Sequence, residues 1–150
     1  MHTYPDVSQV RGRLRPARRH ALTLLIGLGL VGMAGCSLAG DAPGRAVTLE
    51  AARAALADGR TVVIDIREPD EQARGVAAGM QLLPMSQLGR RAAELPRDLN
   101  RPLLLICNTQ NRSSRVADAL RAQGYTQVRY VEGGMSGWAS RGWPLVPPPR

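Results

Sequence analysis

The sequence predicts an α/β fold, a small three-layer domain with a central parallel sheet of about five short strands and helices on both faces. Several short apolar runs lack the polar alternation of a half-exposed strand, which is typical of strands buried on both faces. Helix-like segments separate these runs, as crossover connections between parallel strands require. The chain has 150 residues, a length that fits one domain, and we expect that domain over residues 46–145.

The first half of the expected domain contains turn and cap signals around each element. The expected elements are a helix, a strand, a loop, a strand and a helix over residues 48–60, 61–66, 67–75, 80–85 and 86–95. Thr48 can cap the first helix and Gly59 can end it. Ser86 can cap the last one, although Gly89 disfavours a helix there.

The second half alternates strand and helix in the same way. A strand is expected over 102–107, a helix over 113–124 and a strand over 127–131. A short helix is expected around Trp138, and residues 146–150 form a Pro-rich tail. Together these elements complete a sheet covered on both faces, with right-handed crossovers.

The first 35 residues have the composition of a signal peptide. They hold five Arg and one Asp, and residues 21–35 are an uncharged apolar run of 15 residues. A membrane-spanning helix needs about 20 apolar residues, so this run fits a signal-peptide core better. The small residues before Cys36 resemble the lipobox of bacterial lipoproteins, which implies that Cys36 is lipidated and becomes the mature N-terminus. An uncleaved anchor helix with Cys36 as a bystander stays open.

A lipidated Cys36 implies an exported protein that faces the periplasm. Residues 36–45 are small and polar with one Pro, and we expect them to be a flexible tether of at most about 35 Å. Ser37, and not Asp, follows Cys36, so no inner-membrane retention signal is present and the outer membrane is favoured.

Charge and composition exclude some partners. All 20 basic residues are Arg, and residues 36–150 carry a net charge of +4, which is ordinary for a soluble domain. Because no aromatic residues are interleaved with basic ones, we expect no nucleic-acid binding. No cofactor is implied, and we expect a monomer that binds small molecules.

Cys107 ends the expected strand 102–107, and ligands bind beyond the carboxyl ends of such strands. Loop amides, a helix N-terminus and Arg112 would all favour its reactive thiolate form. Both histidines, His2 and His20, lie in the signal region, which excludes a Cys–His pair and leaves too few ligands for zinc. If Cys36 carries lipid, Cys107 also has no disulfide partner. A buried packing cysteine stays an alternative.

The stretch "CNTQNRS" (107–113) resembles the active-site loop of rhodanese-type sulfurtransferases. The resemblance extends over about 47–145. It includes a segment with Asp65, Arg67, Glu68 and Glu71, and a closing segment with Gly133, Gly134 and Trp138. The chain departs from the family at residues 75–80, where His and Pro are missing, and at Gln110, where the family commonly has Gly. Gln110 is expected to narrow the pocket or change the acceptor.

The resemblance implies that Cys107 is a nucleophile that carries sulfur as a persulfide between a donor such as thiosulfate and an acceptor such as cyanide or a thiol. The residues it implies for substrate binding are Asn108, Thr109, Gln110, Asn111, Arg112, Ser113 and Arg67. It implies that Asp65 and Glu68 support the loop. Asn111 or Ser113 as mere helix caps, and Asp65, Arg67 and Glu68 as a purely structural network, are the alternatives.

The spacing from Cys107 to Arg112 separates two chemistries. Four residues lie between them, which gives a ring of amides sized for one sulfur atom, whereas related phosphatases and arsenate reductases use five. Sulfur transfer is therefore favoured over phosphate chemistry. A non-catalytic, membrane-tethered sulfur carrier or partner-binding module is the remaining alternative.

Overall fold

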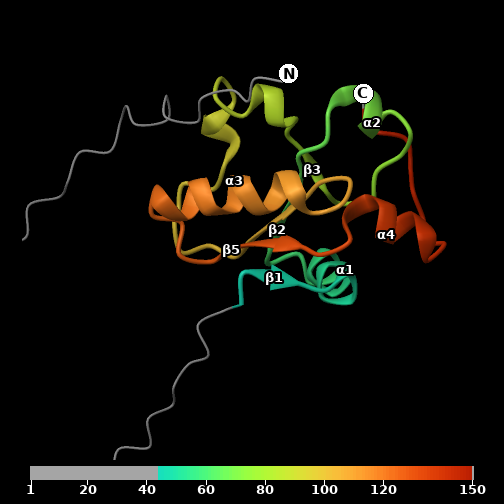
Figure 1. Cartoon of the computed structure of the whole chain (residues 1–150), viewed down its shortest axis with the longest axis horizontal. Helices are drawn as coiled ribbons and strands as arrows, with labels where there is room; N and C mark the ends of the chain where they lie inside the picture. Colours follow the sequence, from blue (N-terminus) through green and yellow to red (C-terminus); the bar gives the residue numbers. More distant parts are fainter. Residues whose placement is uncertain (1–43, 150) are drawn as a thin grey trace, which may run out of the picture.

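The computed structural model describes residues 44–149, so the predicted signal peptide and Cys36 lie outside the described residues. The elements, in chain order, are β1 (Ala46–Val47), α1 (Leu49–Asp58), β2 (Val62–Asp65), α2 (Pro69–Gln72), β3 (Gln81–Leu82), the 3-10 turns η2 (Met85–Gln87) and η3 (Ala92–Glu94), β4 (Leu103–Ile106), α3 (Asn111–Ala122), β5 (Val128–Val131) and α4 (Gly134–Ser140). Strands and helices alternate through most of the chain (Figure 1).

The five strands form one parallel sheet in the order β1-β5-β4-β2-β3. β4 is central and pairs with β2 on one side and β5 on the other. All four residues of β4 are buried, as its apolar run predicts for a strand covered on both faces. The predicted α/β fold with a central parallel sheet is confirmed.

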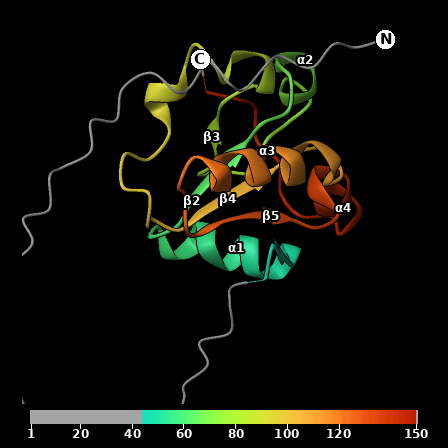
Figure 2. The same cartoon turned by 60° about the vertical axis from the view of Figure 1, so that its left-hand side comes forward.

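Successive side chains of a strand point to opposite faces, so the sheet has two core layers. Leu103 and Leu105 pack with α3 and with the connection between β3 and β4 on one face. Leu104 and Ile106 pack with α1 and α4 on the other. α3 and α1 accordingly lie on opposite sides of the sheet (Figure 2). Cys107 continues the alternation of Leu103 and Leu105, and its thiol belongs to the layer of α3.

Helix α1 follows its sequence signals closely. The Thr48 hydroxyl accepts a hydrogen bond from the Ala51 N–H (3.2 Å), and Gly59 ends the helix with φ 65°. Its buried side chains are Leu49 and Ala52. The helix predicted over 48–60 is confirmed.

The helix predicted over residues 86–95 is wrong. This segment contains only η2 and η3. Leu88 and Leu95 are its only buried side chains, so a regular helix would bury little apolar surface there. Gly89 between them lowers the helix propensity further.

The loop predicted over residues 67–75 contains the one-turn helix α2. Pro69 occupies its first turn, where the missing N–H costs nothing. The Glu71 carboxylate also accepts a hydrogen bond from the Glu68 N–H (3.0 Å), which caps the turn. These local interactions, and not apolar periodicity, make the segment helical.

The remaining differences lie at element ends. Helix α3 begins at Asn111, two residues earlier than predicted. Val146, the first residue of the predicted tail, forms an antiparallel bridge with Val76, with N–O distances of 2.9 and 2.8 Å. No helix among residues 44–149 combines the length and apolar character needed to cross a membrane.

Candidate active site

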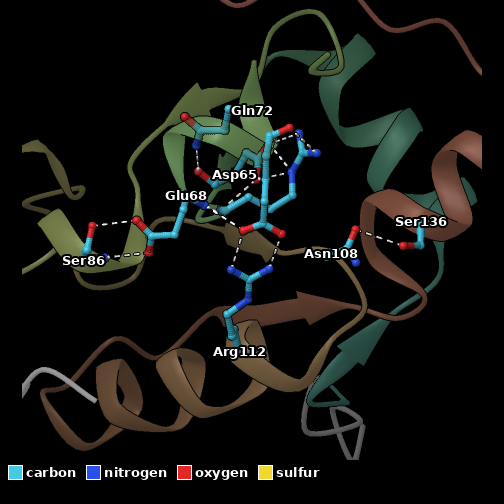
Figure 3. A network of polar contacts seen from close by, with 9 residues as sticks. Asp65, Glu68, Gln72, Ser86, Asn108, Arg112 and Ser136 are labelled. Carbon is cyan, nitrogen blue, oxygen red and sulfur yellow. Dashed lines mark hydrogen bonds and ion pairs between the residues drawn. The ribbon is translucent and has the colours of Figure 1, made fainter. Parts of the chain in front are cut away.

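Three distant segments of the chain meet at the carboxyl edge of the sheet. They follow β2, β4 and β5 and consist of residues 66–72, 107–112 and 132–136. Because all the strands are parallel, their carboxyl ends lie at the same edge. Figure 3 shows the polar contacts that join the three segments.

Cys107 is the first residue after the central strand β4. Its side chain is a free thiol with 1% exposure, packed in the core layer of α3. The next four residues, 108–111, are exposed. The thiol therefore lies beneath residues 107–112, which we call the cysteine loop.

The start of α4 binds the carbonyl side of the cysteine loop. The Met135 N–H donates to the Cys107 carbonyl (2.8 Å), and the Ser136 N–H donates to the Asn108 carbonyl (2.9 Å). A Cβ atom at Gly134 would lie 2.3 Å from the Thr109 carbonyl oxygen. The loop and α4 thus pack backbone against backbone, and only glycine fits at position 134.

These contacts determine where the loop N–H groups point. In a trans peptide unit the C=O and N–H are antiparallel. Two carbonyls bound to α4 therefore direct the N–H groups of Asn108 and Thr109 away from α4. The thiol of Cys107 lies on that same side of the sheet, in the layer of α3.

The loop amides are available to a ligand. Within residues 44–149, the N–H groups of residues 108–113 donate to no protein acceptor. Such a group of orphan donors at the start of a 12-residue helix is suited to an anion. Here the helix is α3, and the cysteine loop that leads into it begins at the buried Cys107.

Arg112 and Glu71 form a bidentate ion pair across the site. The Nη1–Oε2 and Nη2–Oε1 distances are both 2.6 Å, and each side chain is 23% exposed. Hydrogen bonds to Glu71 are the main cause that raises the pKa of Arg112; burial opposes it, and interactions with Glu71 and Cys107 add to it. Hydrogen bonding to Arg112 likewise lowers the pKa of Glu71. Arg112 is thus held charged beside the thiol.

Glu68 connects α2 to the 3-10 turn η2. Its carboxylate accepts hydrogen bonds from the Ser86 N–H (3.1 Å) and the Ser86 hydroxyl (2.6 Å). Ser86 therefore binds Glu68 instead of capping a helix over 86–95 (Figure 3). The contact holds α2 at a point separate from its contact with Arg112.

Arg67 and Asp65 form a buried pair below α2. The Arg67 Nη2 lies 2.6 Å from Asp65 Oδ2, and the side chains are 7% and 0% exposed. The Arg67 guanidinium also donates to the carbonyls of Glu71 (3.2 Å) and Gly75 (2.8 Å). These contacts place Arg67 in the framework that holds α2. Direct contact of Arg67 with a sulfur donor stays a prediction.

The other loop residues predicted for substrate binding lie in different surroundings. Gln110 is the residue before α3, and its φ is −162°, outside the left-handed region that would require glycine. Ser113 is buried and donates to the Gln110 carbonyl (3.1 Å). The side chains of Thr109 and Asn111 are exposed at the rim. No cluster of three or more potential metal-ligating side chains occurs among residues 44–149.

The sequence singled out Cys107 and the cysteine loop but not the partner of Arg112. Glu71 entered the sequence argument only through a resemblance, because nothing local connects residues 41 positions apart. The structural role of Gly134 also depends on a contact between segments. A glycine pair that begins two residues after a predicted strand is the one signal that could have indicated it.

Proteins of similar sequence include one that is named as a sulfurtransferase and one that is uncharacterized. A protein of Allochromatium vinosum named "Sulfurtransferase" is 37% identical over 94 residues, which cover 62% of this chain and 86% of the relative. The uncharacterized protein YqhL of Bacillus subtilis is 37% identical over 79 residues, which cover 53% of this chain and 61% of the relative.

Solved structures agree with the described architecture. A rhodanese-related protein from Thermoplasma volcanium superposes with a TM-score of 0.57 at 29% identity, over 68% of this chain and 97% of the other. A polysulfide-sulfur transferase homodimer from Wolinella succinogenes gives a TM-score of 0.58 at 25% identity, over 67% and 77%. The family model described as "Rhodanese-like domain" matches residues 48–141. The chain belongs to the rhodanese-like domain family.

Proposed function

We propose that the protein is a sulfurtransferase that carries sulfane sulfur as a persulfide on Cys107. The observation that carries the proposal is the thiol beneath a loop whose N–H groups are turned away from α4 and have no acceptor within residues 44–149. Membership of the rhodanese-like family and relatives named as sulfurtransferases support it.

The reaction runs in two steps with thiosulfate as donor. The Cys107 thiolate attacks the outer sulfur, the Cys–S bond to that sulfur forms, and sulfite leaves with the electron pair of the broken S–S bond. An acceptor such as cyanide then attacks the outer sulfur of the persulfide. Thiocyanate forms and the thiolate returns, so that charge and atoms balance in a ping-pong cycle.

The cysteine loop stabilises the charge in this scheme. The N–H groups of residues 108–112 hold the anionic outer sulfur, as preorganised donors hold developing charge in other enzymes. Arg112 contributes positive charge beside the sulfur, while Glu71 fixes its orientation. Asp65, Arg67 and Glu68 hold α2, and with it Glu71, in place.

Mass spectrometry of the intact protein tests the proposal. Incubation with thiosulfate should add the mass of one sulfur atom to the wild type and none to Cys107→Ser, and cyanide should remove it. Ser140→Ala, an exposed change in α4, is the matched control and should load like the wild type. No adduct and no turnover with thiosulfate or polysulfide would refute the proposal.

Turnover assays on the same proteins separate the two alternative functions. A non-catalytic carrier would gain the sulfur atom and release it once to cyanide, but it would show no repeated turnover of thiosulfate to thiocyanate. Phosphate chemistry would require hydrolysis of an aryl phosphate, which the spacing between Cys107 and Arg112 disfavours.

We also propose that the protein is exported and anchored in the outer membrane through a lipid on Cys36. The apolar run over 21–35 and the small residues before Cys36 support this. Cys36→Ala should leave the precursor unprocessed or move the protein to the soluble fraction. A wild-type protein that fractionates as soluble would contradict the proposal.

A further inference from the structure

Gln110 occupies the loop position that is commonly glycine in rhodaneses, and its side chain has a specific partner. The Gln110 Oε1 accepts a hydrogen bond from the Gly133 N–H, at an N–O distance of 2.9 Å. Gly133 is the N-cap residue of α4, and as a glycine it has no side chain that could accept a hydrogen bond from the first turn of the helix. The amide of Gln110 therefore supplies an acceptor that the turn before α4 lacks.

A second side-chain contact joins the same two elements. The Ser136 hydroxyl donates to Asn108 Oδ1 (2.9 Å), a contact that Figure 3 shows between the loop and the first turn of α4. The two contacts lie on either side of the close approach at Gly134. Together they form what we call the α4 clamp: Asn108 and Gln110 on the loop, Gly133 and Ser136 on the helix side.

The clamp acts on the same peptide units that direct the loop N–H groups. The carbonyl of Asn108 binds the Ser136 N–H while its side chain binds the Ser136 hydroxyl. Gln110 secures the other end of the loop, where the backbone turns into α3. If those units rotated, their N–H groups would no longer point away from α4, because the orientation of each N–H is fixed by its peptide plane.

We propose that Gln110 is a positioning residue that keeps the cysteine loop in its sulfur-binding form by bonding to Gly133. Its amide is directed to Gly133, so it acts on the persulfide through the loop and does not contact the sulfur. The effect of Gln110 on the persulfide rests on the proposed sulfurtransferase function. Its effect on the conformation of the loop can be measured on the protein without substrate.

Three variants of the full chain test it. Gln110→Leu removes the acceptor at similar size, and Gln110→Glu keeps an acceptor oxygen at the same length. Ser140→Ala removes an exposed hydrogen bond in the last turn of α4 and is the matched control. Each is compared with the wild type by hydrogen exchange of the Gly133–Ser136 amides, by the lifetime of the Cys107 persulfide in intact-mass spectra, and by melting temperature.

Gln110→Leu should speed exchange of these amides about three- to tenfold, the range expected for one exposed hydrogen bond, and shorten the persulfide lifetime by a similar factor. Gln110→Glu should restore most of the exchange protection. Melting temperatures should stay within a few degrees, since Gln110 is exposed, and Ser140→Ala should match the wild type in all three measurements.

Two results would overturn the proposal. Unchanged exchange in Gln110→Leu would show that the bond to Gly133 does not hold the loop. Faster exchange with an unchanged persulfide lifetime would leave Gln110 a structural contact only. If the wild type never takes up sulfur, the sulfurtransferase function fails and the positioning role fails with it; the exchange measurement distinguishes that case because the clamp would still be detected.

Discussion

The positive charge beside Cys107 is held in one orientation, because Glu71 binds Arg112 through two parallel hydrogen bonds. A bidentate pair fixes the plane of the guanidinium as well as its charge. Glu71 in turn caps α2 and binds the Glu68 N–H with the same carboxylate. One side chain therefore stabilises the first turn of α2 and also fixes the position of the Arg112 guanidinium.

Replacing Glu71 by Gln should weaken both functions. One charged partner of Arg112 is lost while the shape is kept, which should cost about 1 kcal/mol of folding free energy after screening by solvent. A similar loss in the transition state would slow persulfide formation about fivefold to tenfold. Thermal unfolding and the rate of sulfur loading measure the two effects.

Glu94→Gln is the matched control for Glu71→Gln. Glu94 also pairs bidentately with an arginine, Arg91, with N–O distances of 2.6 and 2.7 Å, but that pair is exposed and lies in η3. It should change neither quantity appreciably. Equal effects of the two variants would contradict a special role for Glu71.

The pair also predicts a dependence of stability on pH. Hydrogen bonding to Arg112 lowers the pKa of Glu71 from the ordinary value of 4.5, so the folded state prefers the ionised carboxylate. Its contribution is complete above about pH 4.5 and is lost as pH falls through the lower pKa of the folded protein. The difference in melting temperature between wild type and Glu71→Gln should be constant from about pH 7 to 5 and shrink towards about pH 3. A difference that vanishes before the solution reaches the ordinary pKa of a glutamate would contradict this assignment.

At the level of elements, the cysteine loop and α4 behave as one unit because Gly134 lets their backbones touch. Each element supplies hydrogen-bond partners for backbone groups of the other. The loop carbonyls accept from the first N–H groups of α4, which have no intrahelical acceptor and no side-chain cap. By binding these carbonyls, α4 directs the N–H groups of Asn108 and Thr109 away from itself.

Gly134→Ala should separate the two elements. Its Cβ would lie 2.3 Å from the Thr109 carbonyl oxygen and 2.5 Å from that of Cys107, and φ is +56°. We expect a loss of more than about 3 kcal/mol of folding free energy and no measurable sulfur loading. Chemical denaturation and intact-mass spectra measure these effects.

Gly142→Ala distinguishes the cost of the steric clash at position 134 from the cost of placing an alanine at a positive φ. Gly142 has a similar φ of +65°, but a Cβ atom placed there would meet nothing within 4 Å. Strain alone should cost about 1–2 kcal/mol, with sulfur loading retained. If both alanine variants lost the same stability, the close contact at Gly134 would not be limiting.

The success of sequence-based prediction varied with the kind of element. The strand over 102–107 and the helix over 48–60 were predictable because their signals lie within the segments themselves. The strand is an apolar run, and the helix has a capping residue at each end, Thr48 and Gly59. α2 was missed because a four-residue helix is too short to show an apolar periodicity. The helix over 86–95 was predicted from a cap residue, Ser86, whose hydroxyl binds Glu68 instead. The contact between Arg112 and Glu71 could not be predicted from spacing alone, since it joins segments that meet only in the folded sheet.

For the molecule as a whole, the two ends of the described chain support opposite edges of the sheet. β1 pairs with β5 at one edge. Val146 bridges Val76 in the segment that leads to β3, and Leu145 packs against Gly75, the residue whose carbonyl binds Arg67. The tail therefore supports the framework under α2.

Removing residues 144–150 should destabilise the domain. The deletion removes two backbone hydrogen bonds at Val76 and the bond from Trp138 Nε1 to the Pro144 carbonyl (3.2 Å). At about 1 kcal/mol net for each hydrogen bond, the melting temperature should fall by roughly 10–20 °C. Removing only 148–150 is the control and should have little effect; a similar fall with that shorter deletion would contradict a role for the bridge.

The 1% exposure of Cys107 has a consequence for the speed of its reactions. A compact reagent such as iodoacetamide needs only a small displacement of the loop, whereas a bulky maleimide dye needs the loop to swing open. At saturating dye the rate of labelling therefore cannot exceed the rate at which the loop opens. The limiting rate of labelling then measures the opening rate of the loop. By the same reasoning, a sulfur donor attached to a large protein would have to wait for that opening, and a small inorganic donor would not.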